Sequence, residues 1–196
     1  MKIVIAFLLV FLFPLVVNAS VMTFDSVPAA GIPLPYSENG IFTPAALSFN
    51  NLEAVHIDDF GTGHPDKVEF TMSSRFDALS FDLYGYPTRV IDPFNNVYVQ
   101  GWRGGSLVAS DEFWMGDFNT YLFGDLFSNL DKLIIGVQLP VPFSKCFFEA
   151  PCTHFNIDNV TLTAVPLPAS FPIFFAGLAL LGWVRFRRAV TNSSKQ

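Results

Sequence analysis

Between residues 20 and 164 the chain alternates apolar and polar positions in short runs. Lys67–Met72 places Val, Phe and Met on one side, and Leu79–Leu83 alternates Leu, Phe and Leu with Ser and Asp. Leu133–Leu139 repeats the alternation, and Val21–Phe24 is short enough to be a first strand. A period of two is typical of strands that have one buried and one wet face. These segments are predicted to be strands.

Turn residues separate these runs. Gly104-Gly105 lies between Asn96–Arg103 and Ser106–Asp111, and two glycines supply the positive φ angles that a two-residue hairpin needs. The stretch Pro28–Pro35 is rich in Pro and Gly and is predicted to be a loop, because proline cannot lie in a central strand. A hairpin and a long loop are therefore expected.

The last body segment, His154–Leu162, changes phase. Its first two apolar residues are odd-numbered, at 155 and 157, and its last two are even-numbered, at 160 and 162. One extra residue near Asp158-Asn159 would turn all four toward the core, so we predict a β-bulge there. With seven or more short strands and little helical periodicity, the fold class is predicted to be all-β, an antiparallel, jelly-roll-like β-sandwich.

Met1–Ala19 has the features of a secretory signal peptide. Lys2 supplies the positive charge, Ile3–Val17 the apolar core, and Val17-Asn18-Ala19 the small-residue cleavage site. As a membrane span the run is too short and has the wrong flanks. The mature chain is expected to begin near Ser20, leaving 20–164 as one extracellular domain.

The apolar segment near the C-terminus is predicted to enter a membrane. Phe171–Val184 carries no charge, but a helix of that length rises only about 21 Å. Extended to Pro168–Phe186 it approaches the roughly 20 residues that a span needs. Basic residues follow, and they favour a cytoplasmic position for that end. The basic residues are Arg185, Arg187 and Arg188. A single transmembrane helix with a polar tail, 189–196, is predicted.

Before this helix stands an extended hinge. Its residues are Val165, Pro166, Leu167, Pro168 and Ala169. The order of hinge, apolar helix and arginine cluster over 165–188 resembles the VPLPA variant of the PEP-CTERM sorting signal of Gram-negative bacteria. The resemblance implies recognition and cleavage by an exosortase, a membrane protease, and transfer to the envelope or export, often in bacteria that make exopolysaccharide. The alternative is an ordinary membrane anchor that is never cut.

The acidic charge of the body and its two cysteines exclude some classes of partner and metal site. All 17 acidic residues lie in the body against six basic ones, a net charge of −11. This balance argues against nucleic acid, because binding to phosphates depends on Lys and Arg. Cys146 and Cys152 close a short loop and are expected to form a disulfide in an exported protein. Without a His or Cys cluster they make a poor zinc site.

Two places offer metal-type ligands. The polar stretch His56–Asp66 matches no known metal-loop spacing, and the preferred interpretation is a solvated loop between strands. Asp25 and Asp158 would approach one another if the terminal strands pair, and they would then hold a structural Ca²⁺. The alternative is that Asp158 accepts hydrogen bonds from backbone N–H groups freed at the bulge. No other cofactor is expected.

Trp102, Trp114 and Tyr121 are large aromatic residues that would present flat faces to sugar rings. The alternative is that they pack in the core. Hydrolase and nucleotide-binding motifs are missing, and an acidic pair such as Glu69 and Asp82 is too common in such a body to indicate a glycosidase. No enzymatic activity is expected.

These observations favour an exported protein of the cell envelope or extracellular matrix. Its partners would be the exosortase and, through the C-terminal helix, the membrane, to which it is anchored transiently. The body would be structural or adhesive. The alternative is a carbohydrate-binding module for the exopolysaccharide.

Overall fold

The computed structural model describes residues 18–27, 34–46, 54–58, 66–85, 96–114, 120–137, 154–166, 177–179 and 181–182. The chain divides into two compact units, Val17–Val165 and the pair Met1–Val16 with Pro166–Gln196. In the second unit the described residues are Pro166 and two helical stretches, 177–179 and 181–182. Within the described residues, no helix has the length and apolar character needed to cross a membrane. Most of the predicted signal peptide and of the predicted transmembrane helix lies outside the described residues.

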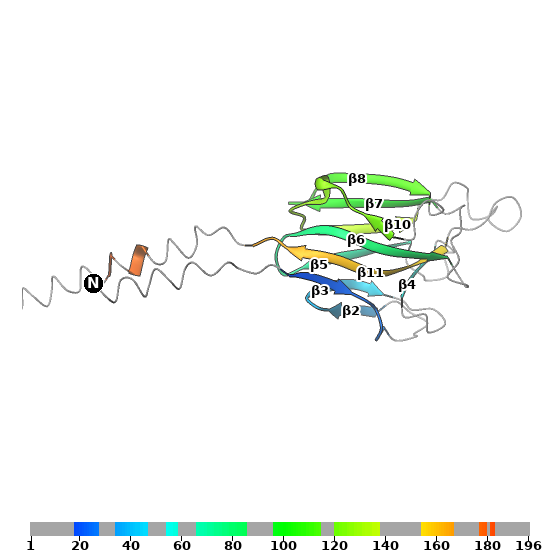
Figure 1. Ribbon diagram of the computed structural model, residues 1–196, viewed down its shortest axis with the longest axis horizontal. Coiled ribbons are helices and arrows are strands. Elements are labelled where there is room, and N and C mark those ends of the chain that lie inside the picture. Colours follow the sequence, from blue (N-terminus) through cyan, green and yellow to red (C-terminus); the bar gives the residue numbers. More distant parts are fainter. Residues whose placement is uncertain are drawn as a thin grey trace, which may run out of the picture. The chain divides into compact units, whose positions relative to one another are not determined.

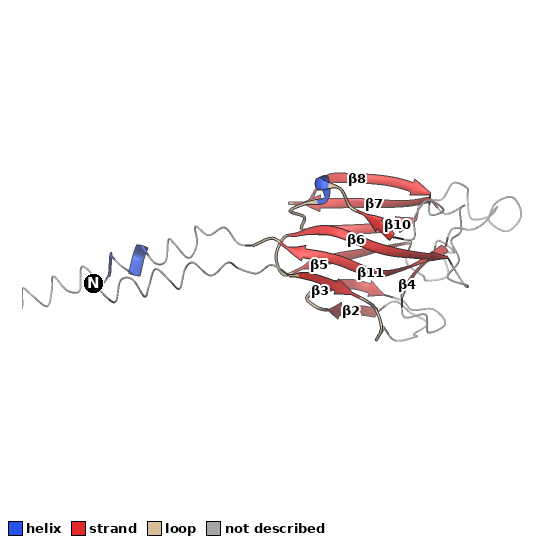
Figure 2. Ribbon diagram, viewed as in Figure 1, coloured by secondary structure: helices blue, strands red, loops and turns tan. Residues whose placement is uncertain are grey.

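The body is built from two antiparallel sheets, and strands dominate it (Figures 1 and 2). In the first sheet β11 (His154–Ala164) is central, with β6 (Phe76–Gly85) on one side and β9 (Thr120–Leu122) beyond it. On its other side β11 pairs with β4 (Val55–Asp58) along its first half and with β1 (Ala19–Met22) along its second. Both long edges of β11 are therefore hydrogen-bonded.

The second sheet has six strands. Their order is β2 (Leu34–Glu38), β3 (Ile41–Ala46), β5 (Lys67–Met72), β10 (Lys132–Val137), β7 (Asn96–Arg103) and β8 (Ser106–Trp114). A 3-10 turn, η2 (Asp125–Phe127), lies between β9 and β10 in the chain. Successive strands alternate between the two sheets except at the hairpins β2–β3 and β7–β8.

The inner faces of both sheets contribute to one hydrophobic core. Val68 and Phe70 of β5 and Leu133 and Ile135 of β10 are buried in it, as the alternation predicts. Aromatic rings gather at the β6–β8–β9 side, where the ring of Phe81 lies 5.4 Å from that of Tyr121. The predicted all-β, antiparallel architecture is confirmed.

The predicted bulge in β11 is present. Asp158 pairs with Asp82, but the next paired residue on β11 is Thr161, which faces Ser80. Two residues of β6 thus span the same distance as three of β11. The bulge contains Asn159, whose φ of 50° lies in the left-handed region that Asn tolerates better than most residues. The four apolar side chains at 155, 157, 160 and 162 are all 0% exposed.

A second bulge follows on the partner strand. Thr161 pairs with Ser80, and Leu162 then pairs with Ala78, so Leu79 is the extra residue of β6. Leu79 is 40% exposed, whereas Phe81 is fully buried. The expectation that Leu79 shares the inner face with Phe81 was wrong, because the bulge turns Leu79 outward. The two bulges compensate and restore the register of the sheet.

Two hairpins join neighbouring strands of the six-stranded sheet. The β7–β8 turn is confirmed, with φ of 57° at Gly104 and 78° at Gly105. The β2–β3 turn at Asn39-Gly40 has φ of 49° and 81°, and it was not predicted although Asn-Gly is a strong hairpin signal. The expected loop Pro28–Pro35 ends earlier than predicted, because β2 begins at Leu34. Proline is tolerated there since β2 is an edge strand.

Candidate binding face

Strand β7 presents alternate side chains to opposite sides of the six-stranded sheet. Val97 and Val99 are buried in the core, whereas Tyr98, Gln100 and Trp102 lie on the outer face and are partly exposed. Side chains two residues apart on a strand are separated by about 6.6 Å. The outer face thus carries two aromatic rings with an amide between them.

The indole of Trp102 is held by its neighbours. Its Nε1 donates to Gln100 Oε1 at 3.3 Å. Lys132, its cross-strand partner on β10, places Nζ 5.3 Å from the ring centroid. Lys132 in turn lies 3.5 Å from Glu69 Oε2 on β5. A cation over an exposed indole contributes about 0.5–1 kcal/mol, so these contacts restrict the ring modestly.

Tyr98 depends on a glycine across the sheet. It pairs with Gly136 of β10, and a Cβ at that glycine would stand 2.5 Å from Tyr98 Cζ. The tyrosine ring therefore lies directly over the backbone of Gly136. Partial burial raises the pKa of Tyr98, and the nearby charges of Asp66 and Glu69 raise it further. Its hydroxyl stays protonated and is able to donate a hydrogen bond.

Trp114 completes the outer face at the end of β8. It follows the buried Phe113, pairs with Asn96 of β7, and is 48% exposed. Tyr121 differs, because it is 6% exposed and its ring stacks on Phe113 with centroids 4.4 Å apart. Tyr121 thus packs inside, as the alternative interpretation has it, and it is not part of the outer face.

The outer face of the other sheet carries a cross-strand network of polar side chains, and the exposed Leu79 and Leu122 lie beside it. His56 and Asn156 form a cross-strand pair between β4 and β11, with His56 Nδ1 2.9 Å from Asn156 Oδ1. Their side chains are only 2% and 1% exposed. The prediction that His56 lies in a solvated loop was wrong, because Val55–Asp58 is a strand. Residues 59–65 of that stretch lie outside the described residues.

Carboxylates of the same face are used within the fold. Asp82 accepts hydrogen bonds from Thr120 Oγ1 at 2.6 Å and Asn159 Nδ2 at 2.8 Å. Asp158 Oδ1 accepts one from the backbone N–H of Asn159 at 2.7 Å, the capping role that the alternative interpretation predicts. Asp25 is exposed in the turn after β1. Among the described segments, no group of three or more His, Cys, Asp or Glu side chains is arranged to hold a metal ion.

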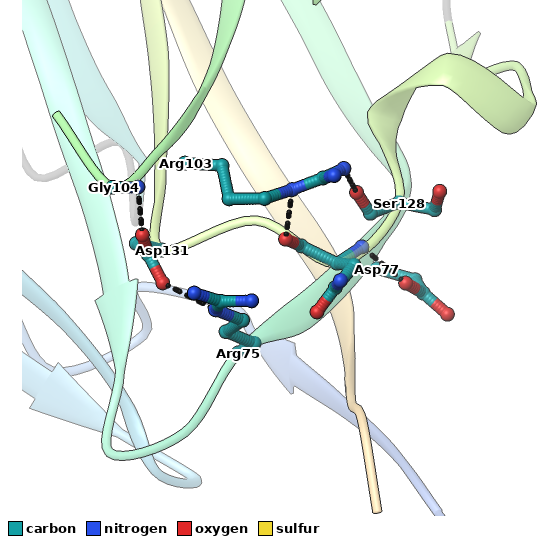
Figure 3. Close-up of polar contacts among 7 residues, drawn as sticks. Arg75, Asp77, Arg103, Gly104, Ser128 and Asp131 are labelled. Carbon is teal, nitrogen blue, oxygen red and sulfur yellow. Dashed lines mark hydrogen bonds and ion pairs between the residues drawn. The ribbon is translucent and has the colours of Figure 1, made fainter. Parts of the chain in front are cut away.

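A polar cluster fastens the β7–β8 turn to the segment before β10 (Figure 3). Asp131 accepts hydrogen bonds from the Gly104 N–H and from Arg75 Nε, the latter at 3.0 Å. The bond from Gly104 and the contact with Arg75 lower the pKa of Asp131. Arg103 donates to the backbone oxygens of Ser128 and Asn129, each at 2.9 Å (Figure 3). All these groups are paired within the fold, so the cluster is structural.

The sorting hinge begins where the body ends. The Val165 N–H donates to Arg75 O at 2.7 Å, and Pro166 is exposed. Ala19 pairs with Thr163, so β1 begins next to the point where β11 ends. The other predicted sorting and disulfide residues lie outside the described residues. They are Leu167, Pro168, Ala169, Arg185, Arg187, Arg188, Cys146 and Cys152.

No protein-family model matches the chain, and no curated protein sequence matches it significantly. The description of these sites therefore depends on the residues and contacts of this chain alone.

Proposed function

We propose that this chain is an exported protein of the cell envelope or extracellular matrix, delivered by its N-terminal signal peptide and sorted by an exosortase through its C-terminal signal. The observation that supports this best is the pairing of Ser20, the first residue of the expected mature chain, with Leu162 near the end of β11. Because these strands are antiparallel, the segments that precede β1 and follow β11 join the body at neighbouring points. The expected start of the mature chain therefore lies next to the start of the sorting hinge.

The hinge has features that suit a protease substrate. The Val165 N–H bonds to the body through Arg75 O, and the exposed Pro166 follows at once. Proline keeps the backbone extended and has no N–H to form secondary structure, so the segment after Val165 remains available to a protease. The three arginines beyond the apolar run would stop translocation.

The body is proposed to be non-enzymatic, with a structural or adhesive role. The alternation of successive strands between two sheets supports the finer assignment of a jelly-roll-like sandwich. Its polar clusters are engaged in cross-strand hydrogen bonds and turn contacts. A stable acidic domain of this kind would contribute surface to a matrix.

A carbohydrate-binding module is the second candidate. It is favoured by the partly exposed rings of Trp102 and Trp114 on one sheet face. Such a module would attach the exported protein to exopolysaccharide rather than act on it.

Intact-mass measurement of the protein from envelope and culture-medium fractions of the producing cells tests the sorting proposal. The expected mature form lacks Met1–Ala19 and the residues beyond the hinge. A form that keeps the C-terminal residues in the membrane fraction would instead indicate a permanent anchor.

A variant with Arg185, Arg187 and Arg188 all replaced by Glu should accumulate unprocessed or misplaced. Replacing three basic residues of the body, Lys67, Arg89 and Lys145, by Glu makes nearly the same change in charge and serves as the matched control, which should be processed normally. Normal processing of the arginine variant would refute the role given to the arginines.

A further inference from the structure

We infer that the outer face of β5, β10, β7 and β8 binds a neutral polysaccharide, with Tyr98, Trp102 and Trp114 as the residues that contact the sugar rings. This inference rests on the second candidate function and gives it a ligand class and a site. Tyr98 was not among the residues that the sequence singled out.

The first argument is the chemistry of the exposed rings. Tyr98 and Trp102 project from the same side of β7, and Trp114 projects from the same side of the neighbouring β8. Pyranose rings present C–H faces that pack against aromatic rings, and their hydroxyls need hydrogen-bonding partners at the ring edges. Aromatic rings combine a large apolar area with such polar edges. A row of rings along a sheet face fits an extended chain of sugars better than a single small molecule, which prefers a concave site.

The second argument is preorganisation. Gln100 and Lys132 restrict the indole of Trp102, and the ring of Tyr98 lies over the backbone of Gly136. Side chains that are already ordered lose little conformational entropy when a ligand binds. The hydroxyl of Tyr98, whose pKa is raised, supplies a donor at the edge of its ring.

The third argument is charge. Lys132, which lies over the Trp102 ring, is paired with Glu69. Lys67 is exposed in the same cross-strand row as Gly136 and Tyr98, but the charges of Asp66 and Glu69 lie close enough to raise the pKa of Tyr98. Glu112, the cross-strand partner of Tyr98, adds an exposed carboxylate, and the body as a whole is strongly acidic. A polysaccharide rich in carboxylates would be repelled, because like charges at an interface oppose association. A neutral chain avoids this cost, so neutral sugars are the class that this face selects.

Affinity electrophoresis of the full-length chain in a neutral detergent tests the inference. The probes are the neutral and acidic fractions of the producing cells' own exopolysaccharide, separated by anion exchange. The neutral fraction should retard the protein, with little change between 50 and 500 mM salt in a parallel pull-down. No retardation by the neutral fraction, or retardation by the acidic fraction alone, would overturn the proposal.

Variants then locate the site. Trp102→Ala and Tyr98→Ala should each weaken binding roughly tenfold or more, as expected for aromatic residues at the centre of an interface. Trp114→Ala, at an exposed strand end, keeps the test valid if a central variant does not fold. Leu122→Ala removes an exposed apolar side chain of β9, which belongs to the other sheet, and should bind normally. Equal binding by all four variants would place the ligand elsewhere.

The result is separable from the export proposal. A chain that is processed normally but binds no neutral polysaccharide would retain its sorting function and lose only the ligand assigned here. Binding of neutral polysaccharide by a chain that is never processed would support the ligand assigned here and contradict the sorting proposal.

Discussion

The two outer faces of the sandwich use their side chains in opposite ways. On the β4–β11–β6–β9 face, His56 bonds to Asn156, and Asp82 accepts bonds from Thr120 and Asn159. On the β5–β10–β7–β8 face the prominent groups are aromatic rings that remain partly exposed. A polar group that is satisfied within the fold stabilises it, whereas an exposed ring gains free energy only by burial against a partner. The first face therefore contributes to stability, and the second is the face for which we propose a role in recognition.

The largest effect is expected from Asp82→Ala on the polar face. The change removes two hydrogen bonds to a carboxylate, each worth about 1.5 kcal/mol, so the free energy of unfolding should fall by about 3 kcal/mol. Urea unfolding measures it. Asp125→Ala, an exposed aspartate of η2, is the control and should change stability by less than about 0.5 kcal/mol. A more stable Asp82→Ala variant would mean that repulsion from Asp158 outweighs these bonds.

Asn156→Ala should destabilise the body by about 2 kcal/mol, because it removes the buried partner of His56 Nδ1. A double-mutant cycle with His56→Ala isolates the pair, since mutations of residues in direct contact are not additive. Strictly additive losses in thermal or urea unfolding would show that the two side chains do not stabilise one another. Glycan binding should be unchanged in both single variants.

Gly136→Ala tests how the aromatic face is supported. The new methyl group would collide with the ring of Tyr98, and the expected cost is about 1.5 kcal/mol together with weaker polysaccharide binding. Adding Tyr98→Ala should recover part of the stability but none of the binding. Gly124→Ala is a matched control, because nothing lies within 4 Å of a Cβ there. Equal behaviour of the two glycine variants would contradict the account.

Low pH should weaken the hydrogen bonds between Glu38 of β2, in the six-stranded sheet, and the residues that follow β1, in the other sheet. Burial favours the protonated form of Glu38, but bonds from the Thr23 hydroxyl and the N–H groups of Thr23 and Phe24 outweigh it and lower its pKa from 4.5. A lowered pKa in the folded state gives stability that is present above pH 4.5 and lost as the pH falls below it.

In Glu38→Gln the free energy of unfolding should fall less between neutral and acid pH than it does in the parent chain, because glutamine does not titrate. Unfolding midpoints at a series of pH values measure it. Asp25→Asn, in an exposed turn, is the control, and a Glu38→Gln profile that matches the parent would dismiss the role of Glu38.

Trp114→Ala should have the smallest effect on folding, less than about 0.5 kcal/mol, because nearly half of its side chain is exposed. Its thermal melting curve should nearly overlie that of the parent while polysaccharide binding falls. A large loss of stability would mean that the ring packs against the body and is not held ready for a ligand.

Much of the fold could be predicted from local pattern. A local sequence pattern a few residues long was enough to predict three features: the Gly104-Gly105 hairpin, strand β5 and the bulge at Asp158-Asn159. No local pattern indicates the bulge at Leu79, because Leu79–Leu83 alternates regularly and only the register against β11 shows the extra residue. Local alternation therefore predicts a strand but not its irregularities.

The candidate site was harder to predict for the same reason. Trp102 and Trp114 were singled out by residue type, as was Tyr121, and exposure separates them only after the strands are paired. Tyr98 and Gly136 lie far apart in the chain, and their contact depends on the β7–β10 register. His56 looked like part of a polar loop because its partner, Asn156, is 100 residues away.

The position of β11 also has a mechanical consequence. Any pulling force applied through the C-terminal tail enters the body at Val165 and passes along β11, which is bonded to β6 on one edge and to β4 and β1 on the other. Force along the strand loads these bonds together in shear, whereas an edge strand would peel away bond by bond. An attachment made at the hinge, of the kind that the proposed sorting would produce, would thus be borne by hydrogen bonds on both edges of β11.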